Sequence, residues 1–537
     1  MATRTKVPKL QMMRKELLHR LVVPVQAWSM SGRDVQIVAP FETELEMGGF
    51  VVVVPPTGPE LLVQITELEL AEREGAVVRL AGDEIGPLAG DAGVSADVTL
   101  MVRYISGVGH VLGAIEPGRP VGIVEAPAQG FQEGTLRVAA PDEIATLLRR
   151  HRGDQLGLDV GTTASGAVRV GLKASGFARH TFMVGQSGSG KTYTLGVLLE
   201  RLLVNTTLPF VVLDPNGDYV HLGSVMSRER IAPRGKPPIS QRLHGELRRS
   251  MRAAGDVAVA SAHSDTLPLR FHLSDLSLAE QALTMGLDAL RDSEEFSAFS
   301  DAVDALGHLD RYGFDGVRAQ LEDTDDEWSQ RVLRRIKNLR VADWSVWART
   351  DEPSFLSRIA GTRGLVLDLG SLANARERSV VALAVMGFFR RRVQRRAFLL
   401  VFDEAHNFFD PDPDDELQRV AVEYGVWIAG EGRKYGLHMV VSTQRPQKIH
   451  RNVISQCDNL VLMRMNSKAD IAELSSIFSF VPSAMINEAR LFAQGEFLVA
   501  GPIATPPLRV ATGPRWCPEG GADLPTTWTL PRTEPRS

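Results

Sequence analysis

A glycine-rich octapeptide constrains the fold of this chain more than any other feature. Its sequence is GQSGSGKT, residues 185–192, and it lies between the apolar run 181–184 and the helix-forming run 193–200. A strand, a glycine loop and a helix in this order are what a phosphate-binding loop requires. Glycine lets successive backbone N–H groups converge on an anion, and the helix presents its positive N-terminal end to that anion. A chance Gly/Ser turn is the alternative, but the full spacing and both flanks favour a nucleoside triphosphate site.

Each part of the octapeptide has an expected role. Lys191 would reach the β- and γ-phosphates, and the Thr192 hydroxyl would ligate Mg²⁺. The predicted nucleotide-binding residues of the loop are Gly185, Gln186, Ser187, Gly188, Ser189, Gly190, Lys191 and Thr192. ATP and Mg²⁺ are therefore the predicted cofactors.

An acid pair follows a second apolar run. Residues 398–402 (FLLVF) are apolar throughout, as a central strand of a parallel sheet requires, and Asp403 and Glu404 come directly after them. At the carboxyl end of such a strand, both acids face the crevice in which ligands bind. Asp403 would hold Mg²⁺ through water, and Glu404 would orient and deprotonate the attacking water. A solvent-facing Asp-Glu pair is the alternative; together with the glycine loop, the pair favours ATP hydrolysis.

Polar residues end two further predicted strands. The run 209–213 leads to Asp214, and the run 438–443 leads to Gln444. Asp214 is placed like Asp403, so it is a candidate for the metal or water network at the nucleotide. Gln444 is the candidate sensor that contacts the γ-phosphate and reports its loss, with an ordinary strand-end cap as the alternative.

Short β-rich runs fill the N-terminal part of the chain, after a polar extension at residues 1–20. Gly, Pro and Asp turns separate these runs, without intervening helical segments. The runs are residues 34–38, 50–54, 61–65, 76–80, 97–104, 121–125 and 134–138. Strands at this spacing predict a small closed β-barrel over residues 21–140.

The rest of the chain alternates strands and helices, as a parallel sheet wrapped by helices does. We predict an α/β nucleotide-binding domain over residues 141–512, which begins with a linker helix at 141–152 and carries a helix-rich insertion at about 222–360. The tail, residues 513–537, has little apolar sequence, so it is expected to be disordered or strapped across a neighbouring subunit. At 537 residues with 44% hydrophobic residues, the chain can bury more than one core.

Composition and charge narrow the location and the partners. The most apolar helical run, residues 380–389, ends at three arginines and is far shorter than the ~20 residues that span a bilayer. The basic start leads into no hydrophobic signal region, and the chain has only two cysteines, which fits a reducing cytoplasm. We therefore predict a cytoplasmic protein without a membrane partner. A net charge of −5 and a pI of about 6.2 require any nucleic acid to meet a local positive surface.

Five motifs in order resemble one family. They are GQSGSGKT, LDPNGDY, VFDEAHNF, EGRKYGL and STQRPQKIHRNVISQCDN. Over about residues 20–512 the chain resembles the HerA family of hexameric DNA-translocating ATPases, within the larger group that contains FtsK. DEAH alone also occurs in superfamily-two helicases, but we find no second helicase domain with its arginine-rich motif. The LSGGQ signature of transporter-type ATPases is also missing from the sequence.

The resemblance implies a RecA-like P-loop core behind a barrel of the HerA and ATP synthase type. It also implies a homo-oligomeric ring, expected to be a hexamer, that moves along double-stranded DNA with a NurA-like nuclease or another effector, in DNA repair or antiphage defence. Arg433 matches a family arginine near the nucleotide, and Arg179, before the strand that leads to Gly185, is a second candidate for acting on a neighbouring subunit's ATP. Which of the two acts in cis and which in trans stays open, and a surface salt bridge is the alternative for both.

Two other functions stay open. One is a conjugation or secretion motor with the same core, and the other is a nucleotide-stabilised scaffold that assembles an effector enzyme with little turnover. The direct signal for DNA is weak, because basic runs such as 390–392 also lie at helix ends, where cations offset the helix dipole. In a ring, a few residues near Arg445, Lys448 and Arg451 would nevertheless track a phosphate backbone.

Overall fold

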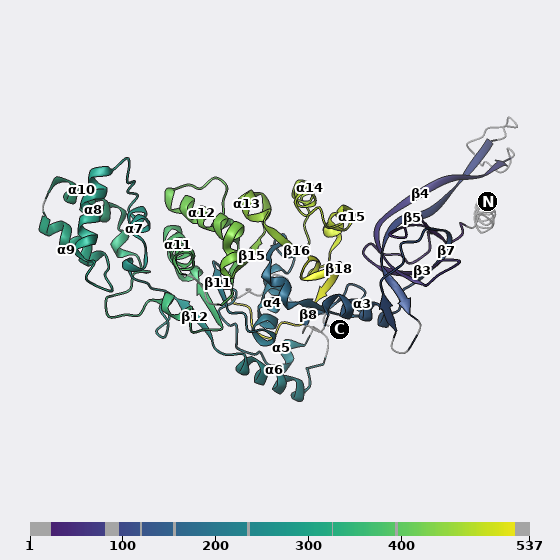
Figure 1. The fold of residues 1–537 in the computed structure, drawn as a ribbon, viewed down its shortest axis with the longest axis horizontal. Helices are drawn as coiled ribbons and strands as arrows, with labels where there is room; N and C mark the ends of the chain where they lie inside the picture. The colour runs from purple at the N-terminus through teal and green to yellow at the C-terminus, as the bar shows by residue number, and fades with distance from the viewer. Residues whose placement is uncertain are drawn as a thin grey trace, which may run out of the picture.

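Two β-sheet units and a helical insertion make up the molecule (Figure 1). The computed structural model describes residues 23–80, 96–116, 118, 121–153, 157–232, 237–324, 326–392 and 396–520, so the predicted extension at residues 1–20 lies outside the described residues. A seven-stranded sheet forms the N-terminal unit and an eleven-stranded sheet forms the centre. In Figure 1 the N-terminal unit and the helical insertion lie at opposite ends of an elongated molecule.

The N-terminal sheet closes on itself. Its order is β2-β1-β7-β3-β4-β5-β6, and β2 also pairs with β5, so six strands form a ring and β6 extends it from β5. Inward-facing side chains such as Val35, Ile37, Val51 and Val63 fill its interior. The strands are β1 (Gln26–Ser29), β2 (Asp34–Pro40), β3 (Phe50–Val54), β4 (Leu61–Leu80), β5 (Ala96–Glu116), β6 (Gly122–Val124) and β7 (Phe131–Val138). The predicted N-terminal β-barrel is confirmed.

The two longest barrel strands differ from the sequence prediction. β4 is continuous where two separate strands were predicted, at 61–65 and 76–80, and β5 continues well beyond the predicted 97–104. The stretch between the two predicted runs of β4 is rich in glutamate, which concealed its strand character. Pairing with β5 satisfies its backbone while most of its charged side chains face solvent. The two strands extend past the barrel as an arm (Figure 1).

The eleven-stranded sheet has a parallel centre. Its order is β12-β13-β11-β14-β15-β10-β16-β17-β18-β8-β9; β12 to β16 run parallel, and the pairs from β16–β17 onward are antiparallel. The strands are β8 (Gly157–Thr163), β9 (Arg169–Lys173), β10 (His180–Val184), β11 (Phe210–Asp214), β12 (Val257–Ser261), β13 (Gly364–Asp368), β14 (Phe398–Phe402), β15 (Leu437–Thr443), β16 (Cys457–Met463), β17 (Glu496–Gly501) and β18 (Ala504–Thr512).

Helices cover both faces of this sheet, which explains the continuous apolar runs. Neighbouring residues of one strand belong to different apolar clusters: Phe182 to one and Met183 to the other, and likewise Leu400 and Leu399. The covering helices include α3 (Pro141–Arg152), α4 (Lys191–Asn205), α11 (Ala375–Arg391), α12 (Glu416–Glu431), α13 (Arg451–Ile454), α14 (Lys468–Ile477) and α15 (Ser483–Asn487). The predicted α/β P-loop core is confirmed. None of the helices in the described ranges has the length and apolar character that a bilayer-spanning segment needs.

The predicted helix-rich insertion at about 222–360 is only partly helical. Its strand β12 joins the edge of the large sheet beside β13, so this part belongs to the core. Sequence reasoning missed β12 because VAVAS is short and weakly apolar. Beyond it, α8, α9 and α10 pack together away from the sheet (Figure 1). The helices of the segment are α5 (Arg228–Ile231), α6 (Gln241–Ala253), α7 (Leu278–Thr284), α8 (Ser293–Ala305), α9 (Phe314–Thr324) and α10 (Glu327–Leu339).

The beginning of the predicted tail packs on its own chain. The backbone N–H groups of Trp516 and Cys517 donate to Glu200 of α4, at 2.9 and 2.6 Å, and the Arg515 side chain is 1% exposed. The expectation of a disordered or neighbour-strapped tail is therefore wrong for residues 513–520, whereas residues 521–537 lie outside the described residues. The segment is held by buried polar partners, which its low apolar content does not reveal.

Candidate nucleotide site

The glycine loop connects β10 to α4 through a tight turn. β10 ends at Val184, and α4 begins at Lys191. Gly188 and Gly190 adopt positive φ values of 73° and 95°, which side chains disfavour. A Cβ on Gly185 would come within 2.7 Å of the Ser189 Oγ atom, so this glycine is required by space. The turn leaves the positive N-terminal end of α4 open to an anion.

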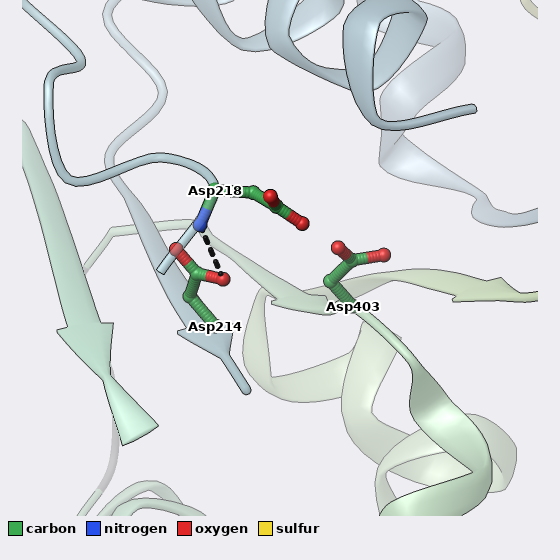
Figure 2. A group of neighbouring side chains, drawn as sticks. All are labelled: Asp214, Asp218 and Asp403. Atoms are coloured by element: carbon green, nitrogen blue, oxygen red, sulfur yellow. Dashed lines mark hydrogen bonds between the residues drawn. The ribbon is translucent and has the colours of Figure 1, made fainter. Parts of the chain in front are cut away.

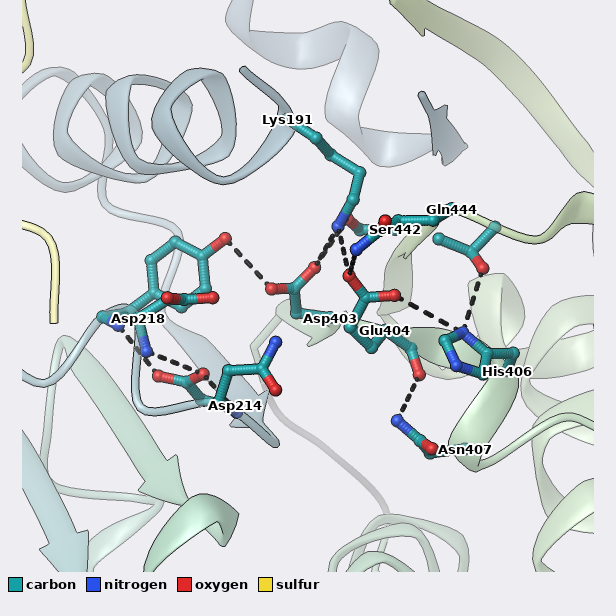
Figure 3. A network of polar contacts seen from close by, with 12 residues as sticks. Lys191, Asp214, Asp218, Asp403, Glu404, His406, Asn407, Ser442 and Gln444 are labelled. Atoms are coloured by element: carbon teal, nitrogen blue, oxygen red, sulfur yellow. Dashed lines mark hydrogen bonds and ion pairs between the residues drawn. The ribbon is translucent and has the colours of Figure 1, made fainter. Parts of the chain in front are cut away.

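Lys191 extends from the loop to the predicted acid pair (Figure 3). Its Nζ atom lies 3.0 Å from Asp403 Oδ1 and 3.1 Å from Glu404 Oε1, and it donates to Ser442 Oγ at 3.2 Å. Lys191 and Asp403 are 4% and 0% exposed. The sheet order explains the convergence, because β10 and β14 are the two neighbours of β15. Fold topology thus joins the residues to which the sequence assigned the phosphates (Lys191), Mg²⁺ (Asp403) and the attacking water (Glu404).

The acids keep the lysine charged. Burial lowers the pKa of Lys191, but the neighbouring Asp403 and Glu404 carboxylates outweigh burial, and the pKa is raised above its ordinary value. A charged amine therefore lies at the edge of the glycine loop, where a polyphosphate would meet it.

One oxygen of Glu404 is anchored and the other is not. Gln444 Nε2 donates to Glu404 Oε1 at 2.6 Å, so the predicted sensor contacts the predicted base directly. Oε2 makes no hydrogen bond within the described part of the chain. His406 Nδ1 lies 3.4 Å from a carboxylate oxygen, Glu404 Oε2, but burial lowers the pKa of His406, which favours its neutral form. The backbone of Glu404 has a φ of 42°, which is uncommon for a residue with a side chain and fixes its direction.

Asp403 also belongs to a cluster of three carboxylates (Figure 2). Asp214, Asp218 and Asp403 each offer one ligand atom, and these atoms lie within 4.8 Å of one another. Asp214 also shapes the loop after β11, because it accepts the backbone N–H groups of Asn216, Asp218 and Tyr219. Sequence reasoning missed Asp218, although two aspartates four residues apart after a strand were a visible signal.

The cluster is crowded with negative charge. Burial, together with the nearby charge of Asp403, raises the pKa of Asp214 to about 7 and that of Asp218 to about 6. The hydroxyl of Tyr219 donates to Asp403 Oδ2 at 3.2 Å, and among the described residues Asp214 and Asp218 form no ion pair. A cation would relieve this repulsion.

The loop lines a cavity of about 850 Å³, within the range of small-molecule sites. Thr192, the predicted Mg²⁺ ligand, lines it beside Lys191, whereas Gly185 and Ser189 do not. The other lining residues come from the loop, from strand ends and from the C-terminal segment: Gln186, Ser187, Gly188, Gly190, Tyr193, Asp218, Gln444, Gln494, Gly495, Ala511, Thr512, Glu519 and Gly520.

The C-terminal wall of this cavity was not predicted. Arg515 holds it: Nη1 lies 3.0 Å from Glu519 Oε1, and Nη2 donates to the carbonyl oxygen of Asp218 at 3.2 Å. The N–H of Gly520 donates to the same carbonyl at 3.0 Å. The segment 513–520 is thereby attached to the acidic loop. The available signal was an arginine beside Trp516 and a cysteine in an otherwise polar tail.

The two predicted arginines lie together, but away from the glycine loop. Arg179 Nη1 is 3.2 Å and Arg433 Nη1 is 3.0 Å from the same oxygen, Asp458 Oδ2. Arg179 precedes β10 and Gly185 follows it, so the strand separates their backbones by roughly 20 Å at ~3.3 Å per residue. The structure therefore does not bring either arginine to the lysine of its own chain.

Fold and site together define a P-loop ATPase. The family model "Helicase HerA, central domain" matches residues 158–384, which contain the glycine loop and the Asp214 strand. The predicted resemblance to the HerA family is thereby confirmed.

Curated relatives agree with this assignment. The DNA double-strand break repair helicase HerA of Pyrococcus furiosus is 21% identical over 384 residues, 64% of this chain and 67% of that protein. Probable helicase MJECL08 of Methanocaldococcus jannaschii is 22% identical over 358 residues, 60% of this chain and 64% of that protein, so the match spans less than two thirds of that relative. Among solved structures, the plasmid coupling protein TrwB with an ATP analogue is similar with a TM-score of 0.46 at 14% identity, covering 72% of this chain and 95% of that chain.

Proposed function

We propose that this chain is a ring-forming motor that hydrolyses Mg-ATP and moves along double-stranded DNA together with an effector protein. The observation that carries the proposal is the convergence of Lys191 with Asp403 and Glu404, at 3.0 and 3.1 Å, beside the glycine loop. The names of the matched relatives, which include DNA double-strand break repair helicases, support DNA as the polymer.

The residues of the site divide the work of hydrolysis. The loop N–H groups and Lys191 would bind the phosphates, and the lysine would exchange its carboxylate partners for phosphate oxygens. Glu404 Oε2, which lacks a hydrogen bond in the described residues, would accept the proton of the attacking water. Gln444 contacts the other oxygen of Glu404, so loss of phosphate would be transmitted to the segment that follows Gln444.

The acid cluster fits Mg²⁺. Oxygen ligands and one or two carboxylates are what this ion prefers, and Asp403 with Thr192, supplemented by Asp218, would supply them. The raised pKa values of Asp214 and Asp218, about 7 and about 6, support a site that favours positive charge. Bound there, Mg²⁺ would neutralise charge on the transferred phosphoryl group.

A ring would complete the site. Arg179 and Arg433 are remote from their own loop, so we assign both to the ATP of a neighbouring copy, with a hexamer as the expected ring. An arginine supplied in trans can be worth ~10³ in rate or more. Arg445, Lys448 and Arg451 follow the sensor, and in a ring their repetition would provide a positive surface for the DNA backbone. The effector would be a nuclease or an antiphage enzyme.

Steady-state ATPase assays with and without linear duplex DNA test the proposal. Glu404→Gln should lower kcat by ~10²–10⁴-fold, the usual contribution of a general base. Duplex DNA should stimulate the wild type and not the variant. Undiminished hydrolysis in Glu404→Gln, or indifference of the wild type to DNA, would contradict the proposal.

The scaffold alternative predicts a different pattern. Glu404→Gln leaves Lys191 and the glycine loop intact, so ATP should still bind. A motor with this substitution loses translocation and effector function, whereas a scaffold keeps effector function. Lys191→Ala is the comparison, because loss of ATP binding should inactivate both.

A further inference from the structure

Asp458 contacts two arginines at the amino ends of the parallel strands, opposite the carboxyl ends where the glycine loop lies. It is the second residue of β16, which runs parallel to β10 and begins level with His180. Its Oδ2 atom contacts Arg179, just before β10, and Arg433, in the 3₁₀ turn Gly432–Tyr435 before β15. One oxygen therefore lies between guanidinium groups that belong to separate elements.

Stability does not account for this arrangement. The side chains of Arg179, Arg433 and Asp458 are 51%, 32% and 45% exposed, and exposed ion pairs are worth about 0–1 kcal/mol. The group also carries two positive charges against one negative charge. Without the carboxylate, the guanidinium groups would repel each other and separate.

The two histidines near the arginines, His180 and His438, are neutral; together we call them the neutral floor. His180 is fully buried, its Nδ1 accepts the backbone N–H of Met439 at 3.0 Å, and burial lowers its pKa to about 4. Burial also lowers the pKa of His438. Within the described residues neither arginine has an ion-pair partner other than Asp458. One carboxylate thus sets where both guanidinium groups lie.

We propose that Asp458 is a positioning residue that holds Arg179 and Arg433 as a pair for the triphosphate of a neighbouring copy. The inference rests on the proposed ring. Both arginines use an Nη1 atom toward Asp458, so the other N–H groups of each planar fork stay available for phosphate oxygens. Two cations bound to one oxygen are close neighbours, as the oxygens of adjacent phosphoryl groups are. Asp458 would contact no nucleotide itself.

The first experiment compares charge and shape at position 458. ATPase kcat and KM are measured on the full-length assembled protein with linear duplex DNA for the wild type, Asp458→Asn and Asp458→Glu. Because small misplacements of catalytic groups cost up to ~10²-fold, Asp458→Asn should lower kcat about 10–100-fold with KM for ATP within about 2-fold. Asp458→Glu, which keeps the charge, should recover part of the loss. The matched control is Glu246→Gln, which removes the acid of an exposed pair with Arg242 at 3.0 Å and should change neither constant.

A double-variant comparison separates this inference from the proposed ring. Arg179→Ala/Arg433→Ala should lower kcat strongly, and adding Asp458→Asn to it should lower kcat no further. An arginine double variant with wild-type kcat would sink the ring proposal. A strong arginine effect with an unchanged or increased kcat in Asp458→Asn would sink the positioning role alone. Native mass and unfolding temperature accompany each variant; loss of assembly in Asp458→Asn and Asp458→Glu alike would make Asp458 an assembly residue and would also overturn the inference.

Discussion

The parallel sheet has one edge at the carboxyl ends of its strands and one at their amino ends, and the charged residues at the two edges differ in burial. At the carboxyl edge, Lys191 and Asp403 are almost fully buried and contact several partners each (Figure 3). At the opposite edge, Arg179 and Asp458 are about half exposed, and the arginine has a single ion-pair partner in the described residues. Both edges carry charged side chains, but only those at the carboxyl edge are buried.

The difference indicates what each edge needs from outside the chain. The buried edge holds a glycine loop, a charged amine and acids in one network, so we expect it to bind a small ligand without residues from a second copy. The exposed edge presents guanidinium N–H groups that have no partner among the described residues. Copies arranged so that the exposed edge of one faces the buried edge of the next would complete each site, which is the arrangement of our proposal.

The largest expected effect is at the buried edge. Lys191→Met removes the cation from between Asp403 and Glu404 and leaves their carboxylates buried and unpaired. Breaking a buried ion pair in this way costs ~3–5 kcal/mol, so the free energy of unfolding without nucleotide should fall by that amount. Urea unfolding measures it, with Lys468→Met at an exposed position as the control. A loss below about 1 kcal/mol would show that the network is not tightly coupled.

The next effect concerns the neutral floor under the exposed edge. Folding lowers the pKa of His180 from its ordinary 6.5 to about 4, so the unfolded chain binds a proton in this window that the folded chain does not. The contribution of neutral His180 to the free energy of unfolding is therefore fully present above pH 6.5. As pH falls from 6.5 toward 4, the free energy of unfolding should decrease by about 3 kcal/mol. Unfolding of the wild type and His180→Gln across this range tests it. The stability advantage of the wild type should shrink as pH falls, and a constant difference would contradict a neutral histidine.

A smaller effect concerns the C-terminal wall of the cavity. Arg515→Met removes the contacts to Glu519 and to the carbonyl of Asp218, so the wall should loosen. Because charged hydrogen bonds are worth ~1.5–3 kcal/mol, the Kd for ATP should rise by about tenfold or more. Titration with a fluorescent ATP analogue measures the Kd. An unchanged Kd would show that residues 513–520 do not contribute to the nucleotide site.

The smallest effect should be the stability of the exposed pair. A double-mutant cycle of Arg433→Ala and Asp458→Asn, followed by urea unfolding, should give a coupling energy below ~1 kcal/mol. The same substitutions should strongly affect the rate of the assembled protein. A large coupling energy would make the pair a structural one and would remove the contrast between the edges.

The sequence predicted the buried edge better than the exposed edge, for a physical reason. The glycine loop and the acid pair are local motifs, in which the spacing itself sets the geometry. Lys191 and Asp403 could therefore be identified without knowledge of the tertiary contacts. Asp218 was missed because its position beside Asp403 depends on the turn after β11, which Asp214 stabilises by accepting backbone N–H groups. The wall held by Arg515 was missed because burial of an arginine depends on partners far along the chain.

Long-range pairing also hid other features. Nothing in the runs around Arg179 and Arg433 reveals that one acid, Asp458, contacts both, since only the sheet order brings them together. The barrel was predicted from the spacing of its strands, whereas the arm of β4 and β5 was not, because its glutamates are typical of loops. Local chemistry was therefore accessible from the sequence, and shared partners were not.

Mixing two inactive variants tests the central claim most directly. Glu404→Gln keeps both arginines but lacks the base, and Arg179→Ala/Arg433→Ala keeps the base but lacks the arginines. If one copy completes the site of the next, rings formed from both variants should regain ATPase activity well above that of either variant alone. Mixed rings, verified by native mass, that stay as inactive as the separate variants would contradict the account.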